Sequence, residues 1–225
     1  MDKENLYEEL KNRIVTLKYK PEQVLNEKEL MQTYNIGRTP LREVLLDLQR
    51  DGLVNILPRY GTLVTSLSLR DFCNLIQLRP TLEELVAEIA FDNLSKEKID
   101  EFKKILERVD AIISEHAKSD LPEEIINELR ALEAKIHLIT YEATTNPYLV
   151  SLCRQLQTNT ERYWHYIYNS PQDSILIKQF SDHKKIYEAL AGRDKAGYKR
   201  LVREHTMNYF ENILSSLSVA GKPLS

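Results

Sequence analysis

Cysteine and long apolar runs are scarce in this chain of 225 residues. Its two cysteines, Cys73 and Cys153, lie far apart, form no CxxC pair and stand among apolar residues at helical spacing. We therefore expect two buried free thiols rather than a disulfide. No apolar stretch approaches the ~18–20 residues that cross a bilayer, and the charged start MDKENLYEEL is unlike a secretory signal. These absences predict a cytoplasmic protein with no membrane association.

An excess of positive charge is also missing, since the formal net charge is −3. Global basicity therefore gives no sign of nucleic-acid binding. The charge is uneven, however: residues 1–70 hold 11 Lys and Arg against 10 Asp and Glu, and the remainder holds 20 against 24. With 42% hydrophobic and 29% charged residues, the composition is typical of a globular protein with a proper core. The length exceeds one typical domain.

The first 66 residues have the pattern of a winged helix-turn-helix domain. Apolar residues at helical spacing predict a first helix, and Asn26 with Glu29 forms a capping-box pattern at the start of a second. The runs LVNIL and GTLVT, joined by PRY, predict a β-hairpin with Gly61 at its turn. The predicted helices span about 4–18, 26–35 and 38–51, with the helix-turn-helix at about 26–45.

The rest of the chain shows no strand signal after a short linker at 67–71. Stop and cap sequences such as NLS, SDLP, TTNP and AGRD divide residues 72–218 into helices. We therefore predict a mainly α protein in which an all-α six-helix bundle follows the winged domain, with a flexible tail at 219–225. The predicted helices are 69–92, 96–117, 122–144, 147–168, 174–191 and 194–216.

Two arginines stand at the start of the third helix, where the helix macrodipole disfavours positive charge. Arg38 and Arg42 are four residues apart and so share one face. In a helix-turn-helix the second helix enters the major groove with its N-terminal residues nearest the bases. Arginine there meets phosphates or guanine, whereas the alternative is a solvated cationic helix end.

The segment NEKELMQTYNIGRTPLREVLLDLQRDGLVNILPRYGTLV resembles the DNA-binding domain of GntR-family bacterial transcription regulators. The shared features are the RTPLRE run, the GLV run and a P-x-x-G wing, at matching spacing. The resemblance implies a recognition helix that carries the arginines and a wing that touches the adjacent groove. The implied DNA-binding residues are Lys28, Arg38, Thr39, Arg42, Arg59 and Gly61.

All five histidines lie in the helical half of the chain. Glu133 and His137 are one helical turn apart on one face. His183 and His205 flank the break AGRD at similar heights on two successive helices. Three helices can thus bring one carboxylate and three imidazoles to one point, which is a set of ligands for a divalent metal. The alternative is histidines scattered half-exposed over the helices.

The segments EAKIHLITYEATTNPYL and DHKKIYEALAGRDKAGYKRLVREH resemble the FCD ligand-binding domain of one GntR subfamily. The resemblance implies a divalent metal, zinc first and nickel or manganese next, held by Glu133, His137, His183 and His205. It also implies a small organic acid bound at that metal. Arg79 is the expected clamp for the acid, with an ion pair to Glu83 as its alternative role. The other effector-binding candidates are Asn146, Arg162 and Tyr163.

We therefore predict a homodimeric transcriptional regulator, and more specifically a repressor, that binds an inverted repeat in double-stranded DNA. A small carboxylate effector bound at the metal would change its affinity for the operator. A regulator that senses the metal itself is the main alternative. A metalloenzyme is the rival from another class, but no further carboxylate is placed as a general base.

Overall fold

The computed structural model describes residues 2–116, 121–167 and 173–220. The chain divides into two compact units. Residues 1–73 and 155–167 belong to unit 1, whereas residues 74–154 and the chain from residue 173 to Ala220 belong to unit 2. The sequence did not predict that the second half of one long helix would group with the N-terminal unit.

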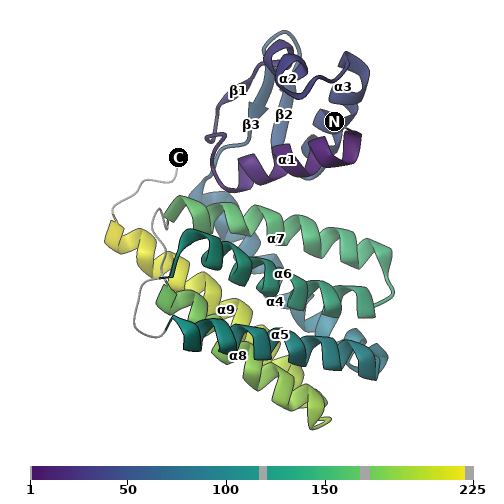
Figure 1. Ribbon diagram of the computed structural model, residues 1–225, viewed down its shortest axis with the longest axis vertical. Helices are drawn as coiled ribbons and strands as arrows, with labels where there is room; N and C mark the ends of the chain where they lie inside the picture. Colours follow the sequence, from purple (N-terminus) through teal and green to yellow (C-terminus); the bar gives the residue numbers. More distant parts are fainter. Residues whose placement is uncertain (1, 117–120, 168–172, 221–225) are drawn as a thin grey trace. The chain divides into compact units, whose positions relative to one another are not determined.

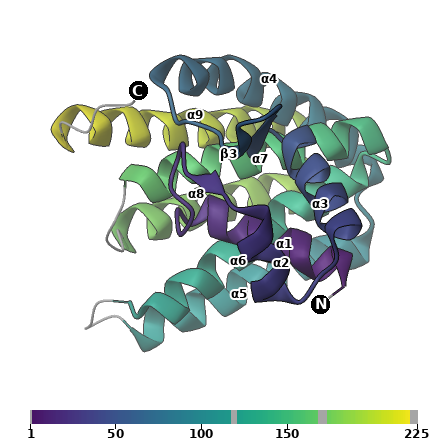
Figure 2. The same cartoon turned by 90° about the horizontal axis from the view of Figure 1, so that it is seen from above.

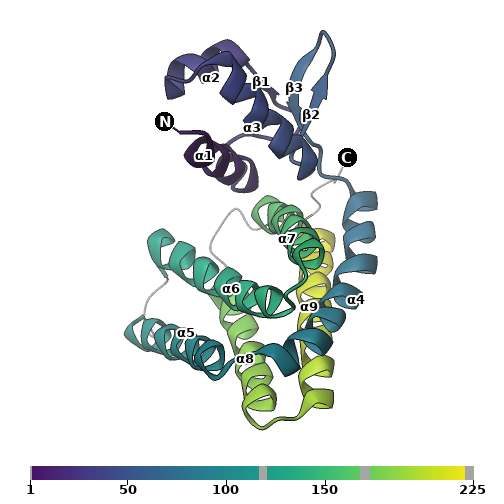
Figure 3. The same cartoon turned by 90° about the vertical axis from the view of Figure 1, so that its right-hand side faces the viewer.

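Unit 1 contains the predicted winged helix-turn-helix (Figure 1). Apolar residues on one face of each helix form its core, and Leu6, Leu10 and Leu45 are at most 1% exposed. The wing is the β2–β3 hairpin, which projects from the helices in Figure 3. Its turn contains Arg59 at φ 70° and is followed by Gly61 at φ 98°, a conformation that suits glycine. The elements are α1 (Lys3–Val15), β1 (Val24–Leu25), α2 (Glu27–Tyr34), α3 (Arg38–Arg50), β2 (Val54–Leu57) and β3 (Gly61–Val64).

One strand was missed by the sequence analysis, which predicted a hairpin alone. β1 pairs antiparallel with β3, with Val24 opposite Leu63, so the sheet has the order β1-β3-β2. Strand β1 has only two residues and lies directly before the Asn26 cap of α2. So short a segment shows no alternation of polar and apolar residues, and only its pairing with β3 defines it.

Unit 2 is all-helical within the described residues, as predicted. Helices α8 and α9 lie side by side, joined at 192–194, as Figures 1 and 2 show. Helix α9 continues to Ala220, two residues into the predicted tail, whose residues 221–225 lie outside the described part of the chain. The elements are α4 (Leu69–Asn93), α5 (Lys96–Glu115), α6 (Glu123–Ala143), α7 (Pro147–Ile167), α8 (Asp173–Ala191) and α9 (Lys195–Ala220).

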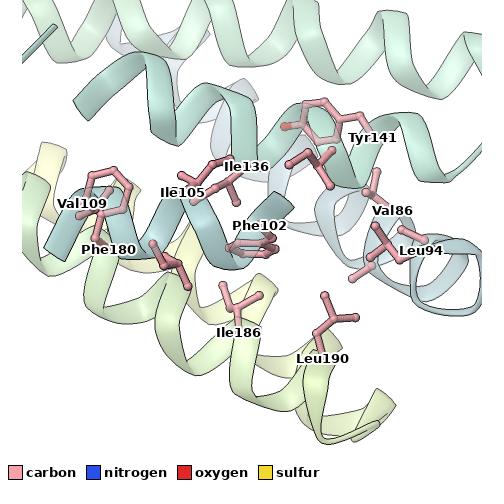
Figure 4. Packing of buried hydrophobic residues seen from close by; sticks show 14 of the residues in the cluster. Val86, Leu94, Phe102, Ile105, Val109, Ile136, Tyr141, Phe180, Ile186 and Leu190 are labelled. Atoms are coloured by element: carbon pink, nitrogen blue, oxygen red, sulfur yellow. The ribbon is translucent and has the colours of Figure 1, made fainter. Parts of the chain in front are cut away.

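The core of unit 2 is formed by apolar side chains from α4, α5, α6, α8 and α9, together with the first half of α7. Figure 4 shows Phe102 of α5, Ile136 of α6 and Ile186 of α8 pointing into the space between their helices. Among the described residues, no helix is both long enough and apolar enough to cross a membrane.

The two cysteines have different environments, which corrects one prediction. Both thiols are free, and Cys153 is buried as expected, but Cys73 is exposed. Its neighbours Phe72 and Leu75 are 0% and 8% exposed, so they take the inward positions of the first turns of α4. The helical register leaves Cys73 on the outer side.

Candidate metal centre and DNA-binding surface

The four residues predicted as metal ligands lie together in unit 2. Glu133 and His137 come from α6, His183 from α8 and His205 from α9, and one ligand atom from each lies within 4.8 Å of all the others. Ligand atoms around one zinc ion stand about 3–4 Å apart, because each bond measures about 2 Å. The three histidines are at most 7% exposed. The cluster therefore needs only a small contraction to hold an ion.

Each of the three imidazoles has an oxygen atom near Nδ1, and that of His183 lies within hydrogen-bond distance. The Nδ1 atom of His183 lies 3.0 Å from the carbonyl oxygen of Gln179. The Nδ1 atoms of His137 and His205 lie 3.9 and 3.8 Å from carboxylate oxygens of Glu83 and Asp182. Metal-bound histidines are oriented in this way, with one ring nitrogen on a carboxylate or carbonyl and the other on the metal. An ion at this point would be bound through Nε2 of the rings, and His137 Nε2 already lies 3.0 Å from the predicted ligand Glu133.

The charges of the cluster also fit a cation. Burial opposes ionisation of Glu133, but the neighbouring His137, 3.0 Å from Glu133 Oε1, lowers the pKa of Glu133 to about 2. Burial, followed by the nearby His205 and His137, lowers the pKa of His183 well below its usual value. Burial lowers the pKa of His137, but Glu133 and then Glu83 raise it above its usual value, so a metal ion would take the place of the proton on this imidazole. These residues therefore fit a divalent ion with N and O ligands, such as zinc.

Arg79, Glu83 and Tyr141 form a buried polar network beside the cluster. Arg79 Nη2 donates to Glu83 Oε1 at 2.8 Å, and the Tyr141 hydroxyl donates to the same oxygen at 2.6 Å. Arg79 and Glu83 are 6% and 2% exposed. Although burial favours the neutral acid, Arg79 and then His137 lower the pKa of Glu83. Of the two predicted roles of Arg79, the ion pair is present, and it is buried rather than on the surface.

A cavity of about 20 Å³ adjoins the cluster. On this measure a water molecule needs about 10–15 Å³, so the cavity holds about one water. Its wall includes the three histidine ligands and Glu83, whereas Arg79 lies one hydrogen bond behind Glu83. The other lining residues are mainly apolar: Val86, Ala87, Phe102, Ile136, Thr140, Ile186, Tyr198 and Val202.

The other three predicted effector ligands have structural contacts. The Asn146 side chain accepts from the backbone N–H groups of Tyr148 and Leu149 and so caps α7. In unit 1, Arg162 donates to Oγ1 and to the carbonyl of Thr65, each at 2.6 Å. Tyr163 donates to the carbonyl of Ser68 at 3.0 Å. Their role in binding an acid stays a prediction.

Two residues of the site were missed as functional groups by sequence reasoning. Glu83 was noted only as a partner for Arg79, although it also faces His137. Asp182 was passed over, although it directly precedes a predicted ligand. A carboxylate beside a histidine in sequence is a weak signal, because Asp182 faces His205 on α9 rather than its neighbour. Only the packing of α8 on α9 pairs the two side chains.

The six predicted DNA-binding residues are all exposed in unit 1. Arg38 begins α3, and Arg42 follows one turn later, where its Nε lies 3.7 Å from Glu27 Oε2. Gly37 provides no side-chain cap for α3, so the first backbone N–H groups stay open to an anion. Asn26 caps α2 through the N–H groups of Lys28 and Glu29, as the capping-box pattern predicts. The predicted DNA-binding surface comprises these six exposed residues: Lys28, Arg38, Thr39, Arg42, Arg59 and Gly61.

Residues 2–64 match the family model of the bacterial regulatory proteins of the gntR family, and residues 74–208 match that of the FCD domain. The chain belongs to the FCD-domain family and carries a gntR-family domain before it. The regulator is 26% identical to the HTH-type transcriptional regulator YdhC of Bacillus subtilis (strain 168) over 199 residues, or 88% of this chain and 85% of the relative. It is also 26% identical to the Uxu operon transcriptional regulator of Escherichia coli (strain K12). That alignment, 228 positions long, covers 93% of this chain and 86% of the relative.

Among solved structures, the regulator is similar to E. coli McbR/YncC, with a TM-score of 0.77 and 22% identity over 95% of this chain and 97% of the other. The metal-free FCD domain of the regulator TM0439 gives a TM-score of 0.53 and 19% identity over 68% of this chain and 99% of the other. These likenesses confirm the fold. The family matches and the curated relatives identify a DNA-binding transcriptional regulator of the GntR/FCD type.

Proposed function

We propose that this regulator is a homodimeric repressor whose affinity for its operator changes when a small organic acid binds at a metal centre in the FCD domain. The observation that carries the proposal is the orientation of the three histidines. Nδ1 of His183 lies 3.0 Å from a carbonyl oxygen, and Nδ1 of His137 and of His205 lies within 4 Å of a carboxylate oxygen. One nitrogen or oxygen atom from each of the four residues lies in a cluster that is largely buried. Scattered structural histidines have no reason to share this arrangement.

Glu133, His137, His183 and His205 would hold the ion. A divalent metal supplies a Lewis-acidic position that receives a carboxylate oxygen. The chain's own residues orient that position: Glu83, Asp182 and the Gln179 carbonyl fix the imidazole rings, and the apolar wall excludes water. We propose that Arg79 supports the site by holding Glu83, and that its Nε, which has no hydrogen-bond partner among the described residues, is left for an acid.

The DNA-binding step requires two copies of the chain. One recognition helix reads only a half-site, and a dimer with two-fold symmetry reads an inverted repeat whose half-sites are about one helical turn apart. We propose that α3 lies in the major groove with Arg38 and Arg42 toward the bases or phosphates. The wing at Arg59 and Gly61 would contact the adjacent groove. Binding of the acid would shift the population of dimers that can bind the operator.

A regulator that senses the metal itself is a second candidate, and the small cavity favours it. A space of about 20 Å³ beside four ligands is enough for an ion and a water molecule, without an acid. In that case operator affinity would follow free metal alone. The acid-responsive regulator instead needs both metal and acid.

The first tests of the proposal are a measurement of the zinc bound per chain and the selection of DNA sites from a random pool. Purified full-length wild type should bind one zinc ion per chain, and His183→Ala should lose it. His116→Ala is the matched control, because His116 lies at the end of α5 outside the cluster and should leave zinc binding intact. Zinc-loaded protein should then select an inverted repeat from a random duplex pool and sediment as a dimer. Retention of zinc by His183→Ala would refute the metal centre. Selection of single half-sites would refute the dimer that reads an inverted repeat.

A further inference from the structure

Tyr198 lines the cavity that adjoins the metal cluster, and it carries a buried hydroxyl. The residue is in the first turn of α9, is 0% exposed and belongs to the cavity wall. Its ring packs against Phe91 with the ring centroids 5.6 Å apart. The hydroxyl has no hydrogen-bond partner among the described residues.

Two other polar side chains of the wall have hydrogen-bond partners within the protein. Thr140 Oγ1 donates to the carbonyl of His137 at 2.7 Å, and Glu83 accepts from Arg79 and Tyr141. A buried tyrosine hydroxyl normally has a partner, because leaving it unpaired costs the hydration it has lost. The unpaired phenol of Tyr198 therefore indicates a group that occupies the cavity when the regulator is at work.

The surroundings of Tyr198 keep its hydroxyl group protonated. Burial, and then the negative charge of Glu83, raise the pKa of Tyr198. The hydroxyl thus stays protonated and acts as a donor, whereas Glu83 already has its own donors. A ligand oxygen, rather than a ligand N–H, is the complementary group.

The size of the cavity limits the rest of the ligand. The free space of about 20 Å³ is bounded in large part by apolar residues, and Tyr198 belongs to the same wall. A six-carbon acid would have to displace several buried side chains in a densely packed core. A carboxylate of two or three carbons, with one oxygen on the metal, needs the least displacement.

We propose that Tyr198 determines the specificity of the effector cavity, because its hydroxyl donates to an oxygen of the metal-bound carboxylate and its ring restricts the ligand to two or three carbons. This inference rests on the proposed acid-responsive function. It adds the class of ligand and a residue that selects it. Tyr198 acts on the ligand and is not one of the groups that hold the metal.

The test is calorimetric titration of zinc-loaded, full-length protein with acetate, lactate, succinate and citrate. Wild type should bind acetate or lactate more tightly than citrate. Tyr198→Phe keeps the ring and removes the hydroxyl, and it should bind the short acids about tenfold or more weakly, as expected for a lost hydrogen bond to a charged group. Tyr198→Ala should gain affinity for succinate or citrate. Zinc affinity should be the same in both variants, which also shows that they are folded.

Tyr187→Phe is the matched control, because Tyr187 packs against Phe102 in the same core and does not belong to the cavity wall named above. It should bind the acids as wild type does. Unchanged acid affinity in Tyr198→Phe would overturn the role of Tyr198 and leave the proposed function intact. A preference of wild type for citrate would overturn the size limit. If zinc-loaded wild type bound none of the four acids, the proposed function and this inference would both fail.

Discussion

Removal of the Arg79 side chain should strongly destabilise the regulator, even though an arginine four residues from a glutamate is usually a weak ion pair. The pair is almost fully buried, with side chains 8% and 3% exposed and a nitrogen–oxygen distance of 2.8 Å. In Arg79→Ala the Glu83 carboxylate would remain buried, with Tyr141 as its main donor. Breaking a buried pair in this way costs about 3–5 kcal/mol of unfolding free energy. For a chain of this size, that loss lowers Tm by roughly 6–20 °C.

The measurement is urea and thermal unfolding of full-length protein in EDTA, followed by circular dichroism at 222 nm. Arg200→Ala is the matched control, because Arg200 and Glu204 have the same spacing and a 2.9 Å contact but are 62% and 51% exposed. Such an exposed pair contributes about 0.5 kcal/mol or less. The double variant Arg79→Met with Glu83→Leu should be more stable than Arg79→Ala, since no lone charge remains. If Arg79→Ala cost no more than Arg200→Ala, the argument from burial would be wrong.

Three further predictions concern the metal, the DNA and pH. Asp182→Asn weakens the orientation of His205 and should lower zinc affinity about 10–100-fold in competition with a chromophoric chelator, whereas an unchanged affinity would remove Asp182 from the site. Arg42→Ala should cost about 1–3 kcal/mol of operator binding in fluorescence anisotropy, and full affinity in this variant would place the recognition surface elsewhere. In EDTA, the lowered pKa of Glu133 means that its stabilisation is complete above the unfolded value of 4.5 and is lost as pH falls from there toward about 2. Glu133→Gln should therefore lose stability less steeply than wild type between pH 5 and 3 in urea titrations, and equal slopes would contradict the assignment.

The fold could be read largely from the sequence, because its elements are long and have clear ends. Helices α1 to α9 follow apolar residues at helical spacing, and caps such as Asn26 and Asn146 mark where two of them begin. The two-residue strand β1 was missed because pairing with β3 defines it. Cys73 was misplaced because an apolar neighbourhood in sequence does not say which side of a helix faces the core.

The four candidate metal ligands were predicted from spacing and resemblance, and the structure brings their side chains into one cluster. The groups around them were not predicted. Glu83 and Asp182 act on histidines from other helices, and the free hydroxyl of Tyr198 is apparent only when its surroundings are known. These relations depend on the packing of unit 2, so no local pattern in the sequence carries them. The hydrogen bonds of Arg162 to Thr65 could not be predicted for the same reason, because the two residues are 97 positions apart in the sequence.

The central claim is that an acid bound at the metal centre controls binding to DNA. The most direct test is the anisotropy of a labelled operator, obtained by selection, titrated with zinc-loaded protein in the presence and absence of acetate, lactate, succinate and citrate. The account predicts that at least one acid weakens operator binding about tenfold or more in wild type and in His116→Ala, but not in His183→Ala. Operator affinity that follows free zinc and ignores all four acids, or an acid response that survives in His183→Ala, would contradict it.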